Sequence, residues 1–531
     1  MVDVTLDTIR TVEATRRRRY SLTLDEVAAL RDRGNVIPVY REIMADMETP
    51  VSAYLKIADG PHSFLLESVE GGQTLARYSF LGSNPYLIVR LERGVAYANQ
   101  RGYKQEISYD DPLVALQSFL APYRAVHVEG LPRFLGGAVG YLSYEAVRYF
   151  EDLPAAPNDP NLFPDGVFMF VDTMLVFDHL ERRIKVVSHV HVDDGMPLER
   201  AYSEAIDKIE ALVARLQSTR PESPVTERTM DPAAVHERAL HNMDREYYDE
   251  MIERAKEYIR AGDIFQVVLS QRVEVETGAH PFTLYRALRT VNPSPFMFYL
   301  QLGDEQIVGA SPEALIRLDG RELTTHPIAG TRRRGRNEEE DLALEAELLA
   351  DEKERAEHVM LVDLARNDIG RVAQPGSVRV PVLLRTDRFS HVIHLVSHVT
   401  GEIRDGLSAV DALRACFPAG TVSGAPKIRA MEIIAELERD RRGFYAGCVG
   451  YVAYSGNMDM ALALRTVAMR DGKVYMQAGG GIVYDSTADY EYQETLNKMG
   501  AAMRALEVAE QLELDERAAR SLSMTVNGVE R

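Results

Sequence analysis

Two stretches in the first half of the chain alternate apolar and polar residues, and this pattern limits the fold more than any other feature. Residues 86–98 read YLIVRLERGVAYA and residues 182–192 read RRIKVVSHVHV. Successive side chains of a β-strand point to opposite faces of its sheet, so the alternation is typical of half-buried strands. From residue 36 to about residue 216 most of the chain has this character, with some helix. We therefore expect β-sheets to supply much of the core.

The length of the chain adds a second constraint, because 531 residues exceed one ordinary compact domain. A helix is expected over residues 245–263, REYYDEMIERAKEYIRAGD, ending at Gly262. The segment STRPESPVTERTMDP is rich in Pro, Ser, Thr and charge, as linkers are. We predict a peripheral segment (1–35), an N-terminal region (36–217), this linker (218–232), a second region of mixed strands and helices (233–510) and a tail (511–531).

Charge and cysteine content exclude several classes of protein. The net charge is −20, from 61 basic and 81 acidic residues, which argues against nucleic-acid binding because phosphate contacts require a basic face. Two cysteines, Cys416 and Cys448, make neither a disulfide framework nor a cysteine-based zinc site. No run of 18 apolar residues and no apolar leader is present, so we expect a cytoplasmic protein without membrane contact.

Two segments with helical character each carry a pair of glutamates three residues apart. Glu354 and Glu357 lie in DEKERAEHVMLVDLARND, and Glu491 and Glu494 lie in DYEYQETLNKMG. This spacing places both carboxylates of a pair on one face of the helix. Such pairs are usually solvated surface charge. Two converging pairs would instead form the cage of hard oxygen ligands that Mg²⁺ prefers.

Three loops and strands have the composition of a ligand site. CFPAGTVSGAPKIRAMEII places small residues before a predicted helix, where backbone N–H groups with Thr421 and Lys427 would suit an anion; an ordinary turn is the alternative. MQAGGGIVYDST contains Gly479, Gly480 and Gly481, which indicate close approach of another group to the backbone. Arg465 in ALALRTVAMR needs a partner, since it sits in an otherwise apolar strand.

Nine motifs occur in one order along the chain. They are GASPEALI, PIAGTRRRG, ERAEHVMLVDLARND, VIHLVSHVTGEI, PAGTVSGAPKIRAMEII, FYAGCVGY, LALRTVA, QAGGGIVYDS and YQETLNK. With these motifs the chain resembles the chorismate-utilising enzymes, and within them the large subunits (component I) of anthranilate synthase, over roughly residues 36–510. The resemblance implies an α/β fold of the α+β type, with large antiparallel sheets packed together and helices on the outside.

The resemblance also implies a metal and a set of site residues. Mg²⁺ would be held by the positions that match Glu354, Glu357, Glu491 and Glu494, and it would neutralise the ring carboxylate of chorismate. Glu313 matches a general acid that helps the ring hydroxyl leave, and His394 matches the active-site histidine of the family. Substrate contacts are implied at Gly330, Thr331, Thr421, Lys427, Tyr445, Arg465, Gly479, Gly480 and Gly481.

Two positions distinguish the reactions within the family. Relatives that add water use a lysine base where this chain has Gln266, and a neutral amide is no such base. Relatives that make aminodeoxychorismate attack the ring with a lysine in PIKGT, whereas this chain has Ala329 in PIAGT. The resemblance therefore implies direct addition of ammonia, loss of hydroxide and elimination of pyruvate, giving anthranilate through aminodeoxyisochorismate as the first step of tryptophan biosynthesis. The alternatives are an aminodeoxychorismate synthase component I and a non-catalytic tryptophan-sensing homologue.

A second site and a partner complete what the resemblance implies. Glu67 and Ser68 match positions that bind the ammonium of the feedback inhibitor L-tryptophan, with Pro295, Phe296 and Met297 near its indole. Phe296 is a departure, because many members carry tyrosine there. Neither cysteine sits on a nucleophile elbow with a distant histidine, so a separate glutamine amidotransferase subunit (component II) is expected to supply the ammonia, in a heterotetramer.

Overall fold

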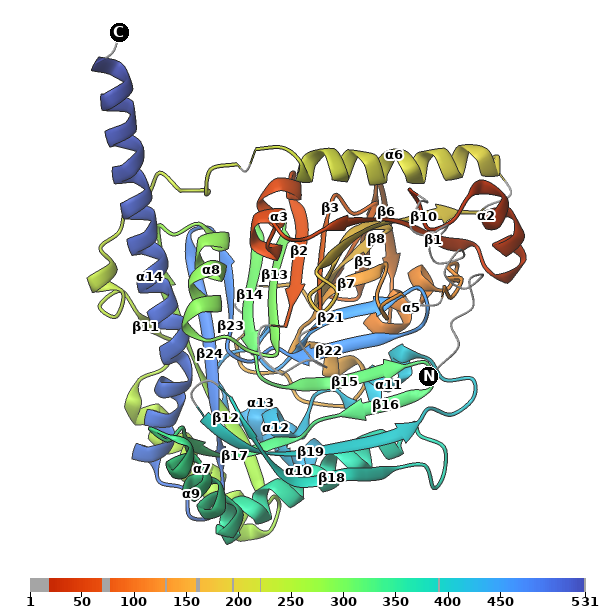
Figure 1. The fold of residues 1–531 in the computed structure, drawn as a ribbon. Coiled ribbons are helices and arrows are strands. Elements are labelled where there is room, and N and C mark those ends of the chain that lie inside the picture. The colour runs from red at the N-terminus through yellow and green to blue at the C-terminus, as the bar shows by residue number, and fades with distance from the viewer. Residues whose placement is uncertain are drawn as a thin grey trace.

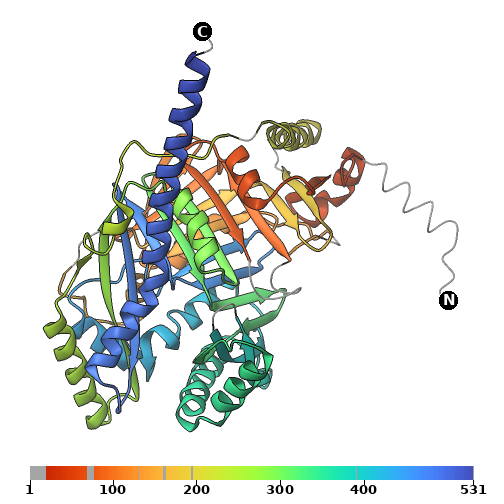
Figure 2. The same cartoon turned by 60° about the vertical axis from the view of Figure 1, so that its left-hand side comes forward.

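The computed structural model describes residues 19–529, apart from 69–76, 129–130, 159–162, 193–194, 220 and 390–391, and it describes the side chains only up to residue 521. Two sheets of 12 strands each form the centre of the molecule, and their named strands pair antiparallel. Helices lie outside the sheets, and the last helix projects beyond the body (Figures 1 and 2). The predicted fold class is confirmed.

The first sheet contains the strand in which Gly479, Gly480 and Gly481 lie. Its order is β1 (Val36–Met44), β10 (Arg183–His191), β9 (Thr173–Asp178), β3 (Tyr78–Ser83), β2 (His62–Glu67), β13 (Phe296–Leu302), β14 (Glu305–Ser311), β23 (Thr466–Arg470), β24 (Lys473–Ile482), β12 (Gln266–Glu276) and β11 (Leu240–His241), with β20 (Gly424–Ala425) paired to β12.

The second sheet contains the strand with the PIAGT motif at one end. Its order is β17 (Ile328–Arg333), β19 (Val392–Glu402), β16 (Glu322–Thr325), β15 (Ala314–Asp319), β22 (Met458–Leu462), β21 (Cys448–Ala453), β7 (Gly137–Leu142), β8 (Gly166–Val171), β4 (Leu87–Glu92), β5 (Val95–Gln100) and β6 (Tyr103–Ser108), with β18 (Arg379–Arg388) paired to β19.

Helices cover the outer faces of both sheets (Figure 1). Apolar side chains of β2, β7, β8 and β21 pack between the sheets, whereas separate clusters join each outer face to its helices. The helices are α2 (Leu24–Leu30), α3 (Pro50–Ile57), α5 (Pro112–Leu120), α6 (Leu198–Leu216), α7 (Arg245–Ala261), α8 (Pro281–Val291), α9 (Glu338–Ala350), α10 (Glu352–Gly370), α11 (Ala409–Cys416), α12 (Gly420–Ser423), α13 (Lys427–Leu437) and α14 (Ala488–Val529), with short 3₁₀ turns η1 (Arg31–Arg33), η2 (Tyr144–Tyr149) and η3 (Pro232–Ala234).

The predicted helix and the two alternating stretches all form in the structure. The predicted helix over 245–263 is α7, which begins at the N-cap Asp244 and ends at Gly262 with φ of +84°, where glycine carries no steric penalty. Residues 86–98 form the hairpin β4–β5. Strand β10 forms as predicted but is buried on both faces. Ile184 and Val186 pack in the cluster that contains α6, and Val187, on the face that the alternation assigned to solvent, packs in the cluster between the two sheets.

The two predicted regions share both sheets. Strand β2 pairs with β13 in the first sheet, and β7 pairs with β21 in the second. The linker 218–232 runs along α14, where Arg517 donates to the backbone oxygen of Arg228. The division at 218–232 thus separates no sheet from another, and the assignment of roles to the two regions stays a prediction. None of the helices within the described ranges has the length and apolar character that a membrane crossing requires.

Candidate active site

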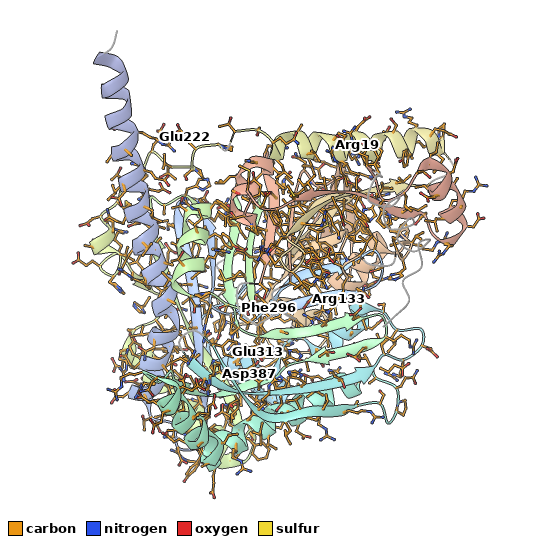
Figure 3. The ribbon with its side chains drawn as sticks, in the orientation of Figure 1. Arg19, Arg133, Glu222, Phe296, Glu313 and Asp387 are labelled. Carbon is orange, nitrogen blue, oxygen red and sulfur yellow. The ribbon has the colours of Figure 1, made fainter. Side chains whose placement is uncertain are left out.

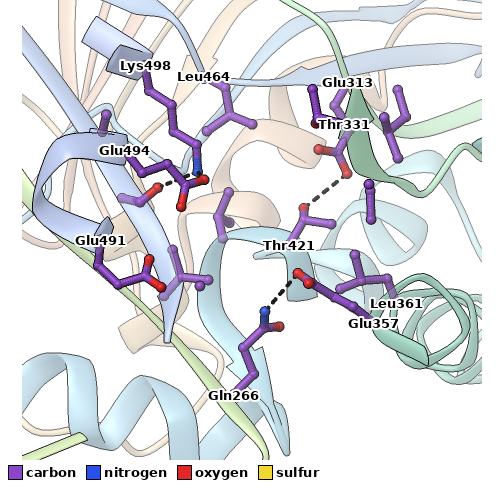
Figure 4. Close-up of a pocket in the computed structure, with 18 of the residues that line it drawn as sticks. Gln266, Glu313, Thr331, Glu357, Leu361, Thr421, Leu464, Glu491, Glu494 and Lys498 are labelled. Atoms are coloured by element: carbon purple, nitrogen blue, oxygen red, sulfur yellow. Dashed lines mark hydrogen bonds and ion pairs between the residues drawn. The ribbon is translucent and has the colours of Figure 1, made fainter. Parts of the chain in front are cut away.

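A cavity of about 390 Å³ opens where the two sheets meet helices α10, α12 and α14. Figure 4 shows side chains from all three helices pointing into it from opposite walls. Fourteen of the predicted site residues line this cavity: Gln266, Glu313, Gly330, Thr331, Glu354, Glu357, His394, Thr421, Tyr445, Arg465, Gly479, Gly481, Glu491 and Glu494. Ala329 lines it as well. The sequence motifs therefore converge on one place.

Glu313 lies between the end of β14 and the start of β15 and is only 7% exposed. Its Oε1 accepts a hydrogen bond from Thr421 Oγ1 at 3.0 Å. Burial raises the pKa of Glu313 to about 8, against the lowering effects of the Thr421 hydrogen bond and the Arg465 charge. A carboxyl that keeps its proton at neutral pH while facing a cavity is suited to general acid catalysis.

His394 is fixed from the neighbouring strand. Its Nδ1 lies 2.9 Å from the carbonyl oxygen of Gly330 and 3.1 Å from Thr331 Oγ1. Because a carbonyl only accepts, Nδ1 carries the proton, and Nε2 is left with its lone pair. Burial lowers the pKa of His394 to about 4, so the ring is neutral. The contact depends on a bulge in β17 at Gly330, whose φ of +69° suits glycine.

The four predicted metal ligands lie on two walls of the cavity, with Glu354 and Glu357 on α10 and Glu491 and Glu494 on α14. Burial raises the pKa of Glu491 to about 7, and the charge of Glu494 adds to that effect. Burial also raises the pKa of Glu357, reinforced by the charges of Glu354 and Glu494. The cavity thus brings together carboxylates whose negative charges repel one another.

Existing partners offset part of this charge. Gln266 Nε2 donates to Glu357 Oε1 at 3.0 Å, and Lys498 Nζ lies 2.8 Å from Glu494 Oε1. Oε2 of Glu491 is buried without a hydrogen-bond partner in the described structure. Across the described ranges, no three His, Cys, Asp or Glu side chains gather into a preformed metal cluster. An oxygen-only site with surplus charge and an orphaned carboxylate oxygen fits Mg²⁺, which keeps several waters and takes few protein ligands.

The three glycines of β24 are explained by what approaches them. A Cβ at Gly479 would lie 2.8 Å from the hydroxyl of Tyr445, one at Gly480 would lie 2.7 Å from Glu491 Oε2, and one at Gly481 would lie 2.5 Å from Gln266 Nε2. All three distances are too short for a side chain, so each glycine makes room for one polar group of the site. Gly480 does not itself line the cavity.

Arg465 and Tyr445 both line the cavity. Arg465 adopts φ of +47°, and its burial lowers the pKa of the guanidinium below its ordinary value. No carboxylate among the described residues forms an ion pair with it, and Glu313 opposite is held neutral. A cation without an ion-pair partner in a cavity is suited to a substrate carboxylate.

Lys427 is placed differently from the sequence prediction. It does not line the cavity, and its ammonium donates to both oxygens of Asp368 at 2.8 Å. The stretch before α13 is also more than a loop, since Gly420–Ser423 forms the one-turn helix α12 that carries Thr421. The structure therefore gives Lys427 the role of a buried ion-pair partner at the base of α13.

Sequence reasoning missed several residues that line the cavity. Lys498 is the most informative, because it follows Glu494 by four residues on α14 and also donates to the backbone oxygen of Gly479 at 2.9 Å. The spacing of Glu494 and Lys498 was the available signal. The other polar residues missed are Lys353, Gln477, Ser486 and Tyr490.

The second predicted site also forms one cavity, of about 100 Å³. Glu67, Ser68, Pro295, Phe296 and Met297 all line it. Missed by sequence reasoning were Arg317 of β15 and Asp459 of β22, which form an ion pair at 2.8 Å in its wall.

Glu67 in this second cavity already has partners. Its carboxylate accepts from the hydroxyl of Tyr285 and from Nε of Arg289. Phe296 pairs with Ser311, two residues before Glu313, so the second cavity lies close to the first (Figure 3).

Comparison with known proteins agrees with this geometry. The sequence model of the family described as chorismate binding enzyme matches residues 62–504. The chain is 47% identical over 488 residues to anthranilate synthase component 1 of Acetivibrio thermocellus, covering 92% of this chain and 98% of that relative. It is 48% identical over 481 residues to the protein of the same name from Pseudomonas aeruginosa, covering 90% and 96%.

A solved structure shows the same fold. The crystal structure of anthranilate synthase component I from Streptococcus pneumoniae TIGR4 superposes with a TM-score of 0.72 at 39% sequence identity, covering 87% of this chain and 99% of that one. Sequence and fold agree over most of both chains. The chain therefore belongs to the family of chorismate binding enzymes, as a homologue of the anthranilate synthase component 1 proteins.

Proposed function

We propose that this chain is the synthase component of an anthranilate synthase and converts chorismate and ammonia to anthranilate, pyruvate and water. The observation that carries the proposal is the protonated, buried Glu313 in one cavity with the Arg465 cation, the neutral His394 and four carboxylates. Relatives that align with 90% and 92% of this chain are named anthranilate synthase component 1.

Binding would fix the two carboxylates of chorismate. Arg465 and Tyr445 would hold the carboxylate of the enolpyruvyl side chain, next to the backbone of Gly479–Gly481. Glu354, Glu357, Glu491 and Glu494 would hold Mg²⁺ with several waters. When bound, the cation would supply charge neutralisation for the ring carboxylate.

The first chemical step joins nitrogen to the ring. The lone pair of ammonia forms a bond to the carbon beside the ring carboxylate, the double bonds shift, and the ring hydroxyl leaves. Glu313 gives its proton to that hydroxyl, which departs as water. Gln266 and Ala329 support ammonia as the nucleophile, because the first donates its amide to Glu357 and the second has no reactive group.

The second step makes the ring aromatic. The hydrogen on the carbon that now bears nitrogen is removed as a proton, and the C–O bond to the enolpyruvyl group breaks, which releases pyruvate. Nε2 of the neutral His394 is the available base, since Nδ1 is committed to Gly330. The reactants and products balance: chorismate and ammonia give anthranilate, pyruvate and water.

The source of ammonia is proposed to be a separate glutamine amidotransferase. Cys416 and Cys448 are both buried in the described fold, and burial raises the pKa of each thiol. Neither suits a glutaminase nucleophile, which needs an accessible thiolate.

We further propose that L-tryptophan inhibits the enzyme from the second cavity, where its ammonium would share the Glu67 carboxylate with Arg289.

The test uses the fluorescence of anthranilate. Purified chain, chorismate, Mg²⁺ and ammonium at mildly alkaline pH should give a fluorescence rise, and glutamine should replace ammonium only when an amidotransferase subunit is added. Consumption of chorismate without anthranilate would refute the proposal. Addition of L-tryptophan should slow the reaction.

A further inference from the structure

The arginine run that follows the PIAGT motif is not explained by the proposed reaction. Arg332 and Arg333 end strand β17 and Arg334 follows it, and none of the three lines the active-site cavity. Their environments differ: the side chain of Arg332 is 20% exposed, whereas that of Arg333 is 65% exposed and pairs with Glu340 at the surface. Arg334 pairs with Asp341 of α9, whereas Arg332 donates to Glu354, which lines the cavity. Arg332 is therefore the member of the run that is linked to the site.

Arg332 contacts three carboxylates at the junction of α9 and α10. Its Nε donates to Glu347 at 2.8 Å, one Nη donates to Asp351 at 2.8 Å, and the other donates to Glu354 Oε1 at 3.2 Å. Three donors of one planar group thus fix three acceptors at once. A lysine ammonium lacks this fork geometry.

One of these partners, Asp351, bears on where Glu354 lies. Asp351 is the N-cap of α10, and its side chain accepts from the backbone N–H groups of Lys353 and Glu354. Oε2 of Glu354 lies only 3.2 Å from the position that a Cβ of Gly330 would occupy. Arg332 therefore holds one oxygen of Glu354 and the start of its helix, while the second oxygen stays at the cavity wall.

We propose that Arg332 is a positioning residue that orients Glu354 for divalent cation binding. The inference rests on the proposed function, because Glu354 acts as a ligand only if the site takes Mg²⁺. Arg332 also follows Thr331, which contacts His394, so the same strand sets both the carboxylate and the histidine. Partners that orient a metal ligand typically change metal affinity by about 10–100-fold when they are replaced.

The charge of Arg332 acts in the opposite direction from its geometry. A guanidinium near the site repels a divalent cation, so removal of the charge would strengthen binding and mask the loss of orientation. Arg332→Lys separates the two effects, because it keeps the charge and loses the fork. Arg333→Lys is the matched control, since it makes the same change one residue away on an exposed side chain.

The experiment measures binding of Mn²⁺, as a spectroscopic substitute for Mg²⁺, by electron paramagnetic resonance without chorismate. Arg332→Lys should weaken Mn²⁺ binding about tenfold, whereas Arg333→Lys should bind like the wild type. Circular dichroism and thermal unfolding of each variant report whether the fold is kept.

A double-mutant cycle with Glu354→Gln separates positioning from general destabilisation. If Arg332 acts through Glu354, Arg332→Lys should cause no further loss of Mn²⁺ affinity in the Glu354→Gln background. Equal affinity of Arg332→Lys and wild type, or a further tenfold loss in the double variant, would overturn the inference. Absence of Mn²⁺ binding by the wild type would instead refute the magnesium part of the proposed function.

Discussion

Replacement of Glu313 by glutamine should slow turnover strongly while leaving the fold intact. The two side chains have the same shape, and the glutamine carbonyl can still accept the hydrogen bond from Thr421. The variant lacks only the acidic proton. Loss of a positioned general acid costs about 10²–10⁴-fold in rate, so kcat for anthranilate formation should fall in that range.

The same substitution should change stability in a pH-dependent manner. The pKa of Glu313 rises from its ordinary 4.5 to about 8 in the folded protein. Between these values the folded carboxyl keeps a proton that the unfolded one releases, so the wild type loses stability as the pH rises through this window, in total about 4–5 kcal/mol. Glutamine cannot ionise. Glu313→Gln should therefore match the wild type near pH 4.5 to 5 and exceed it above pH 8.

Two assays check this prediction together. Denaturant unfolding at both ends of the pH window measures stability, and the wild-type kcat/KM for chorismate is followed against pH at a constant concentration of unprotonated ammonia. The latter should fall as the pH rises through about 8, because the acid must be protonated to act. Activity of Glu313→Gln within a few-fold of wild type, or a stability difference that does not depend on pH, would refute the reasoning.

Three further substitutions test other parts of the site. Ala329→Lys should reduce anthranilate formation about tenfold or more without changing the unfolding midpoint, because it puts an amine and its bulk where ammonia must approach; unchanged turnover would contradict this. Gly480→Ala should raise the Mg²⁺ concentration for half-maximal activity about tenfold, since the new methyl group meets Glu491 Oε2 at 2.7 Å; an unchanged Mg²⁺ titration would count against that carboxylate as a ligand. Ser68→Ala should raise the L-tryptophan concentration for half inhibition about fivefold, through loss of one hydrogen bond of about 1 kcal/mol, and should leave uninhibited turnover unchanged.

The sequence contained enough to predict the site but not its supporting contacts. Motif order predicted which residues meet, and Glu354, Glu357, Glu491 and Glu494 do line one cavity. Lys427 was misplaced because its partner Asp368 lies 59 residues away, on a helix whose approach no local pattern reveals.

Burial was the property least accessible from local patterns. The alternation over residues 182–192 predicted a half-buried strand, yet His189 within it is buried, and its Nδ1 lies 3.0 Å from the backbone oxygen of Asp172. The alternation of β10 predicted the strand correctly, but it could not show that the second face, which carries Val187, packs between the two sheets. The pairing of β2 with β13 is likewise a long-range fact, and it alone brings Glu67 beside Met297.

The identity of the product tests the central claim most directly. Incubation of the purified chain with chorismate, Mg²⁺ and isotope-labelled ammonium, followed by chromatography and mass spectrometry, identifies the product and the position of its nitrogen. The account predicts anthranilate that carries the label on the carbon next to the carboxylate, together with an equal amount of pyruvate. Labelled aminodeoxychorismate, or unlabelled isochorismate, would contradict it.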